Sequence, residues 1–294
     1  MAYEPPMPDC WTETVVTVPA DLAEAVGSFL LDLGSPGLVT AEGDGTVALT
    51  AFLASDATVQ LEALRTFCDD LTASAPNRAC AGIVTRRLLQ ADWAHSWMAH
   101  FPPLAVGERL YIVPPWIDEI PSERIPIVID PGLAFGTGHH ATTQGCLVLL
   151  ERAVSAQSVR RALDLGTGSG ILAIALAKLG VAEIEAVDID PEARRAAADN
   201  CARNGVATSV SIGDALRPTL GEFDLIVANL LSTLLIDLAP KLVGALALGG
   251  HVIASGILSA EAEGVAQAFA AHHLEERARI ADGEWITFDF ALSP

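Results

Sequence analysis

Ala162-Leu-Asp-Leu-Gly-Thr-Gly-Ser-Gly170 lies in the middle of the chain and runs directly into the apolar segment from Ile171 to Leu179. An apolar run, an acidic residue, glycine at every second position and a helical segment predict a strand, a tight turn and a helix N-terminus. Glycine lacks a Cβ atom, so such a turn adopts left-handed backbone angles and lets a ligand approach the main chain closely. The free N–H groups of the first helical turn then face that ligand. The stretch predicts a nucleotide-binding turn, although some glycine-rich turns only connect a strand to a helix.

The spacing of the glycines distinguishes this turn from two other nucleotide-binding loops. A dinucleotide loop needs Gly-x-Gly-x-x-Gly, and a P-loop ends in Gly-Lys followed by Ser or Thr. Residues 166–170 read Gly-x-Gly-x-Gly and contain no lysine. The sequence therefore disfavours both an NAD-dependent dehydrogenase and a P-loop nucleotide-binding protein.

Strand-like and helical segments alternate regularly from residue 160 onward. This alternation predicts an α/β fold with a doubly wound, mostly parallel seven-stranded sheet and helices on both faces. The last two β-like runs are joined by a short turn at Asp282-Gly283, so at least one strand is expected to be antiparallel. The predicted strands cover residues 162–165, 183–188, 209–212, 223–228, 251–255, 275–281 and 285–291, and the predicted helices cover residues 171–179, 191–204, 231–247 and 260–271.

The first 90 residues predict a smaller, separate α+β domain. Their patterns of hydrophobic residues give the order β-α-β-β-α-β, which is the order of a ferredoxin-like sandwich. No cluster of catalytic side chains occurs there, so recognition or structural support is the expected task. We expect residues 1–90 to form this domain, residues 91–103 a linker helix and residues 104–294 the ligand-binding domain. The predicted elements of the small domain are strands at 11–19, 37–41, 46–52 and 82–89 and helices at 20–33 and 56–71.

The chain is strongly acidic. Its 294 residues include 37 acidic and 17 basic side chains, which give a formal net charge of −20. Such a surface repels a phosphate backbone and attracts cationic partners, so direct binding to nucleic acid is disfavoured. A basic partner protein and a simple gain in solubility both remain open as reasons for the charge.

Several sequence features favour a cytoplasmic protein. Lys178 interrupts the longest apolar run before the roughly 20 residues that a bilayer span needs. Residues 1–11 contain no basic segment followed by an apolar one, so no signal peptide is expected. The five cysteines are scattered without a Cys-x-x-Cys pair, which predicts reduced thiols in a core, not a disulfide framework or a zinc site.

Polar residues occur where the predicted parallel strands end, and ligands bind at this edge of such sheets. Asp188 follows Gly166 by 22 residues, close to the offset of about 20 at which an acid accepts hydrogen bonds from ribose hydroxyls. Asp190 precedes Pro191 and is expected to cap the next helix. Asn229 closes the fourth strand, where an uncharged amide is suited to orienting a nucleophile. Asp214 follows the third strand. Its side chain is suited to accept a hydrogen bond from the exocyclic amine of an adenine, and it is equally suited to being a simple turn residue.

Residues 129–143 form a second unusual stretch, rich in glycine and threonine, directly before an apolar helix expected at residues 144–154. Thr142 or Thr143 is expected to cap that helix. Two glycines at 136 and 138 indicate a loop that folds closely over another group. His139 and His140 are adjacent, so their side chains diverge and a metal site formed by the pair is not expected.

These stretches resemble a known family. The DLGTGSG loop, the VDID acid and the ANLL strand end are similar to the class I S-adenosylmethionine-dependent methyltransferases over residues 160–294. A more specific resemblance is to the bacterial methyltransferases that modify large-subunit ribosomal protein L11. It rests on DPGLAFGTGHHATT at 130–143, SGILAIALAKLG at 169–180, VDIDPEA at 187–193, ANLLSTLLIDLAP at 228–240 and SGIL at 255–258, with VGERLYIVPPW at 106–116 in support.

The resemblance implies a methyl donor, a substrate and a set of contacts. S-adenosylmethionine is the implied cofactor, and Thr142, Gly166, Gly168, Asp188 and Asn229 are the implied cofactor-binding residues. The implied substrate is the basic ribosomal protein, methylated on lysine side chains and on an α-amino group, and residues 1–90 are the implied recognition domain. A neutral amine held in line with the activated methyl group suffices for such a transfer, so no side chain is required as a general base.

Two residues depart from the family pattern, which usually reads FGTGTHPTT at this loop. His139 replaces a threonine and Ala141 replaces a proline, so the loop is less pre-ordered and substrate access is expected to differ in detail. His140 is retained and is the candidate if a general base is needed. A methyltransferase for another protein lysine or a small molecule, and a non-catalytic S-adenosylmethionine-binding scaffold, remain open as alternatives.

Overall fold

The computed structural model describes residues 10–35, 37–43, 45–54, 57–74, 81–89, 101–131, 136–207, 209–213 and 223–292. The chain divides into two compact units, Met1–Pro102 and Pro103–Pro294. Most of the linker helix expected at 91–103 lies outside the described residues, as does Asp214.

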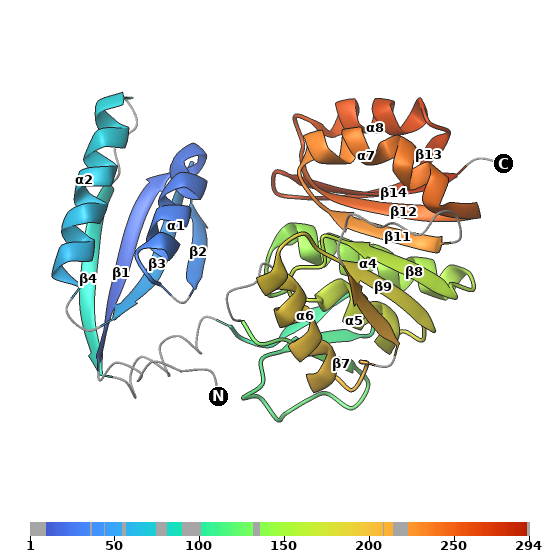
Figure 1. The fold of residues 1–294 in the computed structure, drawn as a ribbon, viewed down its shortest axis with the longest axis horizontal. Helices are drawn as coiled ribbons and strands as arrows, with labels where there is room; N and C mark the ends of the chain where they lie inside the picture. The colour runs from blue at the N-terminus through green and yellow to red at the C-terminus, as the bar shows by residue number, and fades with distance from the viewer. Residues whose placement is uncertain are drawn as a thin grey trace. The chain divides into compact units, whose positions relative to one another are not determined.

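The smaller unit contains a four-stranded antiparallel sheet and helices on one of its faces (Figure 1). Its core joins Val16 and Leu49 of the sheet to Leu30 and Leu64 of the helices, and all four side chains are at most 1% exposed. The strands lie in the order β2-β3-β1-β4. The elements are β1 (Cys10–Pro19), a short 3-10 helix (Ala20–Leu22), α1 (Ala23–Asp32), β2 (Leu38–Gly43), β3 (Thr46–Ala54), α2 (Thr58–Ser74) and β4 (Ala81–Leu89).

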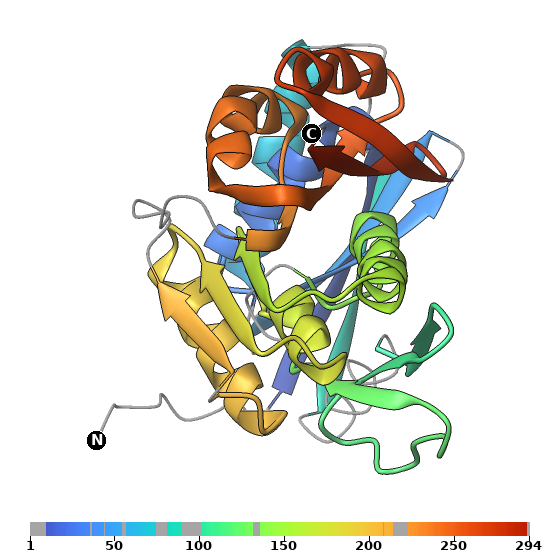
Figure 2. The same cartoon turned by 90° about the vertical axis from the view of Figure 1, so that its right-hand side faces the viewer.

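The larger unit is built on a seven-stranded sheet in the order β10-β9-β8-β11-β12-β14-β13 (Figures 1 and 2). The pairs from β10 to β12 are parallel, and β14 is antiparallel to both of its neighbours. The predicted mostly parallel sheet with an antiparallel strand near its end is therefore confirmed. The strands are β8 (Arg161–Leu165), β9 (Glu183–Val187), β10 (Val210–Gly213), β11 (Phe223–Asn229), β12 (Leu246–Leu258), β13 (Leu274–Asp282) and β14 (Trp285–Leu292).

Helices cover both faces of this sheet and create two apolar cores. On one face lie α4 (Ala141–Ala156), α5 (Ile171–Lys178) and α6 (Pro191–Arg203), and on the other lie α7 (Ser232–Ala245) and α8 (Ala262–Ala270) (Figure 1). The first six residues of α5 are at most 4% exposed, so this helix is buried on all sides. Each leucine or isoleucine side chain buried in this way contributes about 1.5–3 kcal/mol to the stability of the folded state. None of the helices in the described residues is long and apolar enough to cross a membrane.

A three-stranded sheet precedes α4 and joins β5 (Leu104–Val106), β6 (Leu110–Val113) and β7 (Ile125–Val128). Asn200 lies in α6, and Asn204 is the C-cap residue of that helix. Their side chains bind β7 and the residues that follow it. The Nδ2 group of Asn204 donates to the carbonyl oxygen of Val128 at 2.6 Å, and Oδ1 accepts from the Val128 N–H at 2.9 Å. Asn200 Oδ1 accepts from the Asp130 N–H at 3.2 Å. The second glycine loop therefore starts from a fixed point beside the sheet.

Candidate active site

The glycine loop follows β8, and its glycines have the left-handed angles that the sequence predicts. The φ angles of Gly166, Gly168 and Gly170 are 79°, 54° and 83°. The N–H groups of Gly166 and Thr167 both donate to the carbonyl oxygen of Val187 at the end of β9, at 2.8 and 3.0 Å. A Cβ atom on Gly170 would lie 3.1 Å from the Cα atom of Ala197 in α6. The turn is therefore held by the neighbouring strand and helix, and its shape requires glycine.

Asp164 lies directly beneath this loop, at the end of β8, and is completely buried. Its Oδ2 atom accepts hydrogen bonds from the Thr167 hydroxyl at 2.6 Å and from the Ala173 N–H at 3.1 Å. Its Oδ1 atom is buried with no hydrogen-bond partner. Burial raises the pKa of this carboxyl from 3.8 to about 6, and the two hydrogen bonds act in the opposite direction. A buried acceptor without a partner favours a ligand that brings a donor or a positive charge to this part of the loop.

We expect Asp164→Asn to raise the free energy of unfolding at pH 7. The folded pKa is above the unfolded value, so the contribution of this carboxyl to stability is complete below about pH 4 and is lost as the pH rises through 6. The loss amounts to about 3 kcal/mol for a shift of about two pKa units. Denaturant unfolding of both proteins at pH 4, 5, 6 and 7 measures it. An identical pH dependence for the two proteins would contradict the burial of a titrating Asp164.

Asp188 follows β9, and its carboxylate is held by the main chain on both sides. Oδ2 accepts from the Gly168 N–H, and Oδ1 accepts from the Asp190 N–H, each at 3.0 Å. A carboxylate has about four acceptor sites, so two such bonds leave room for two hydroxyl donors. Asp190 accepts from the Glu192 N–H at 2.9 Å and caps α6, with Pro191 in the first turn, as predicted.

The second glycine loop packs against the first. Ser169 donates its hydroxyl to the carbonyl oxygen of Gly136 at 2.6 Å. A Cβ atom on Gly138 would lie 2.6 Å from the Ile112 side chain of β6. The prediction that this loop folds closely over another group is confirmed at these two glycines. Residues 132–135 lie outside the described residues.

The prediction that a threonine caps the following helix is wrong. Helix α4 starts at Ala141, three residues earlier than expected, and its N-cap is His140, whose Nδ1 atom accepts from the Thr142 N–H. Thr142 and Thr143 therefore lie in the first helical turn and are 1% exposed. The hydroxyl of Thr142 is freed for other partners.

Thr142 and Asn229 meet at the end of β11. The Nδ2 group of Asn229 donates to the Thr142 hydroxyl oxygen at 3.2 Å. Ser255 of β12 donates to the carbonyl oxygen of Thr142 at 3.2 Å and shares a 2.7 Å hydrogen bond with Thr287 of β14. Gly145 makes this approach possible, because a Cβ atom there would overlap the Thr287 hydroxyl. Ser255, Thr287 and Gly145 are supporting residues that the sequence analysis missed.

The backbone after Asn229 is also tightly fixed. Leu230 donates its N–H to the carbonyl oxygen of Ser255 at 2.9 Å, and its side chain fills the space beside Gly166. Gly256 has a φ angle of 84°, and a Cβ atom there would overlap the Leu230 carbonyl oxygen. The sequence analysis named Gly256 only within the SGIL stretch and predicted no contact for it.

The structure thus brings the five predicted residues to one edge of the sheet. Thr142 contacts Asn229, Gly168 contacts Asp188, and Gly166 lies against Leu230, the neighbour of Asn229. All of them lie at the carboxyl ends of β8, β9 and β11 or in the helix that packs there. This edge is where ligands bind in doubly wound sheets.

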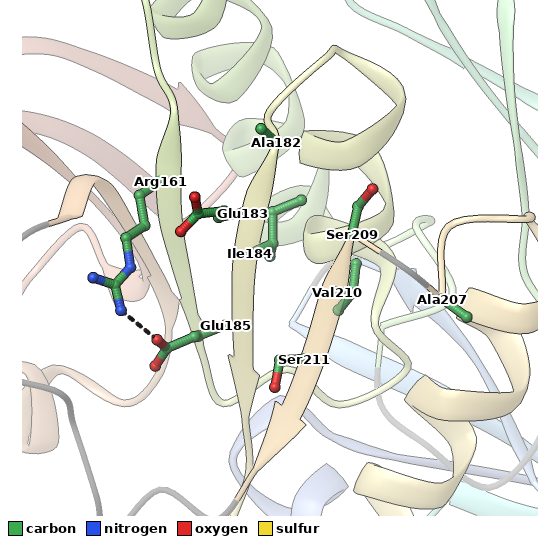
Figure 3. Close-up of a pocket in the computed structure, with 9 residues that line it drawn as sticks. All are labelled: Arg161, Ala182, Glu183, Ile184, Glu185, Ala207, Ser209, Val210 and Ser211. Atoms are coloured by element: carbon green, nitrogen blue, oxygen red, sulfur yellow. Dashed lines mark hydrogen bonds and ion pairs between the residues drawn. The ribbon is translucent and has the colours of Figure 1, made fainter.

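A surface cavity of about 470 Å³ lies elsewhere (Figure 3). Arg161, Glu183, Val210 and their neighbours line it at the amino ends of β8, β9 and β10, and an ion pair of 2.7 Å joins Arg161 to Glu185. Because this is the opposite end of the strands from Asp188 and Asn229, the cavity is no part of the candidate site.

Potential metal ligands and thiols are the two remaining kinds of reactive side chain in the described part of the chain. No group of three or more potential metal ligands occurs among those residues. The four cysteines described are buried and form no disulfide with one another, and burial raises the pKa of Cys146 and brings that of Cys201 to about 11. The thiols of Cys146 and Cys201 therefore stay protonated and unreactive at neutral pH.

A mostly parallel seven-stranded sheet with an antiparallel strand inserted before its last strand, together with this glycine loop, defines an α/β methyltransferase. The chain belongs to the family of ribosomal protein L11 methyltransferases (PrmA), whose family model matches residues 10–292.

Individual relatives agree with this assignment. A ribosomal protein L11 methyltransferase of Trichlorobacter lovleyi is 40% identical over 97% of this chain and 99% of its own length. One of Pelobacter propionicus is 38% identical over 94% of this chain and 96% of its own. A crystal structure of ribosomal protein L11 methylase from Lactobacillus delbrueckii subsp. bulgaricus matches with a TM-score of 0.60 and 36% identity, over 65% of this chain and 99% of that one.

Proposed function

We propose that this protein transfers methyl groups from S-adenosylmethionine to amines of ribosomal protein L11, on lysine side chains and on the α-amino group. The observation that carries the proposal is the convergence of Asp188, the glycine loop and the Thr142–Asn229 pair at one edge of the sheet. Membership of a family named for this substrate supports it.

The residues present fit the proposed cofactor. Asp188 is pre-oriented by two N–H donors and has acceptor sites for two ribose hydroxyls. Gly166 and Gly168 permit close approach to the main chain, and the unpartnered Oδ1 atom of Asp164 suits a nearby positive charge. S-adenosylmethionine carries a ribose, an ammonium group and a sulfonium centre, and it supplies an activated methyl group when bound.

Asn229 is the residue that we assign to orienting the substrate amine. An ammonium group has no lone pair, so the substrate must present a neutral amine, and an apolar pocket favours that form. The side chain of Asn229 lies at the end of β11 and is partly exposed, where it is able to accept an N–H from the amine and aim its lone pair. Exclusion of water and alignment are sufficient for the transfer, so we assign no general base.

The smaller unit has a proposed role in recognising the substrate. We assign residues 1–90 to a ferredoxin-like recognition domain, residues 91–103 to a linker and residues 104–294 to the methyltransferase domain. The β-α-β-β-α-β order and the strand order β2-β3-β1-β4 support the first assignment. A net charge of −20 suits a basic ribosomal protein as partner, in the cytoplasm and without direct contact to nucleic acid.

The test is incubation of the full chain with methyl-labelled S-adenosylmethionine and purified ribosomal proteins. Label is expected in one small basic protein, identified as L11 by mass spectrometry, and in peptides that contain lysine or the N-terminus. Label in a different protein or a small molecule would move the enzyme to another substrate. Tight cofactor binding without transfer to any component of a cell extract would indicate a non-catalytic binding protein.

A further inference from the structure

His140, Thr142 and Asn229 form a hydrogen-bonded chain whose direction can be read from the atoms involved. The amide nitrogen of Asn229 is a donor only, so the Thr142 hydroxyl oxygen accepts from it at 3.2 Å. The hydroxyl hydrogen of Thr142 is then available for its other partner, the Nδ1 atom of His140, at 2.7 Å. The same Nδ1 atom accepts the Thr142 N–H at 3.3 Å. Nδ1 is therefore an acceptor twice, which places the proton of the neutral ring on Nε2.

The ring of His140 is held in this orientation by a second contact. Its centroid lies 5.0 Å from that of Trp285 in β14, at an interplanar angle of 67°. Edge-to-face contacts of this kind favour one ring position over others. The Nδ1 acceptor consequently stays directed at Thr142.

The chain fixes which way the Asn229 amide faces. Because Nδ1 accepts the main-chain N–H of Thr142, the Thr142 hydroxyl donates to Nδ1, and its oxygen is left to accept from Nδ2 of Asn229. Oδ1 is then the other branch of the amide, and no described residue donates a hydrogen bond to it. Without the Nδ1 acceptor, the Thr142 hydroxyl is free to donate to Oδ1, and the two amide orientations become similar in energy. A flipped amide would present a donor where an attacking amine needs an acceptor.

We propose that His140 is a positioning residue that acts through Thr142 to keep Asn229 Oδ1 facing the substrate amine. The inference rests on the proposed function, because the orientation matters for a nucleophilic amine. It assigns His140 no contact with the reacting atoms and no role as a proton acceptor. The competing explanation is purely structural, since His140 also caps α4.

Two substitutions separate these roles. Serine is a preferred N-cap residue, so His140→Ser is expected to retain the hydrogen bond from the Thr142 N–H. Its Oγ atom is one bond from Cβ, whereas Nδ1 is two bonds away, so the serine hydroxyl is not expected to reach the Thr142 hydroxyl. Asparagine is also a preferred N-cap residue, and its Oδ1 atom lies two bonds from Cβ, as Nδ1 does. His140→Ser is expected to lower kcat about tenfold with little change in cofactor affinity or melting temperature, and His140→Asn to restore most of kcat. Equal kcat values for wild type and His140→Ser, or equally low values for the serine and asparagine variants, would overturn the proposal.

A second measurement does not depend on activity. In the ligand-free protein, ¹⁵N NMR is expected to show the Nε2–H tautomer of His140, and the Asn229 side-chain amide is expected to exchange with water faster in His140→Ser than in wild type. A predominant Nδ1–H tautomer would overturn the hydrogen-bonded chain. Absence of methyl transfer by the wild type, with the expected tautomer present, would instead count against the proposed function.

Discussion

Gly256→Ala is expected to lower the free energy of unfolding by about 4 kcal/mol and to abolish cofactor binding. Gly256 has a φ angle of 84°, at which a side chain is strained. A Cβ atom there would also overlap the Leu230 carbonyl oxygen and lie 2.9 Å from its carbonyl carbon. Because these are main-chain atoms, relief requires the end of β11 to move, and Asn229 moves with it. Denaturant unfolding and calorimetric titration with S-adenosylmethionine measure the two effects.

Gly249→Ala is the matched control for this prediction. Gly249 lies in the same strand, β12, with a φ angle of 74°, but no atom lies within 4 Å of the position of its Cβ. Gly249→Ala is therefore expected to lose only about 1 kcal/mol, because alanine is strained at a positive φ angle but its Cβ atom overlaps no other atom. Equal losses in the two variants would show that the contact between Gly256 and Leu230 has no special importance.

Asp188→Ala is expected to weaken binding of S-adenosylmethionine about 100-fold. The substitution removes the acceptor of the two hydrogen bonds that we propose for the ribose, each contributing about 1.5 kcal/mol to binding. The Gly168 N–H also loses its acceptor, so the glycine loop is less well fixed. Calorimetric titration gives the dissociation constant, and an unchanged value would remove Asp188 from the cofactor site.

Asp190→Ala shows whether the effect is specific. Asp190 lies two residues away and caps α6, and its loss is expected to lower the free energy of unfolding by about 1 kcal/mol. Cofactor affinity is expected to stay near the wild-type value, because no bond from this side chain reaches the glycine loop among the described residues. A similar loss of affinity in both variants would attribute the effect of Asp188→Ala to general damage at the start of α6.

The sheet of the larger unit could be predicted from the sequence because its strands are buried and its helices show regular apolar spacing. Val227 and Ile253, in adjacent strands, are both completely buried, so hydrophobicity alone marks them. The start of β12 was predicted too late, at residue 251, although the strand begins at Leu246. The preceding helix was predicted to extend to residue 247, and residues 248–250, which include two glycines, were left between that helix and the strand. Strand β5 was missed because three residues are too few to show a period.

Site residues at the ends of strands could be predicted from the sequence. Contacts between residues far apart in the sequence could not. Asp188 and Asn229 follow strands, and their meeting edge is set by the parallel order. By contrast, Thr287 lies 145 positions after Thr142, and only the folded sheet brings both to Ser255. The cap of α4 was assigned wrongly because threonine is a commoner N-cap residue than histidine. Here the threonine is needed inside the first turn, where it bonds to Asn229.

The position of β14 determines when during synthesis the site can form. This strand follows both β12 and β13 in the sequence, yet it lies between them. A nascent chain that stops before residue 285 has two unpaired strand edges, which favour aggregation, and lacks the Thr287 partner of Ser255. Completion of the sheet and anchoring of the first turn of α4 therefore both depend on β14 and occur together. A chain that stops before residue 285 has neither the complete sheet nor the Thr287 hydroxyl beside Ser255.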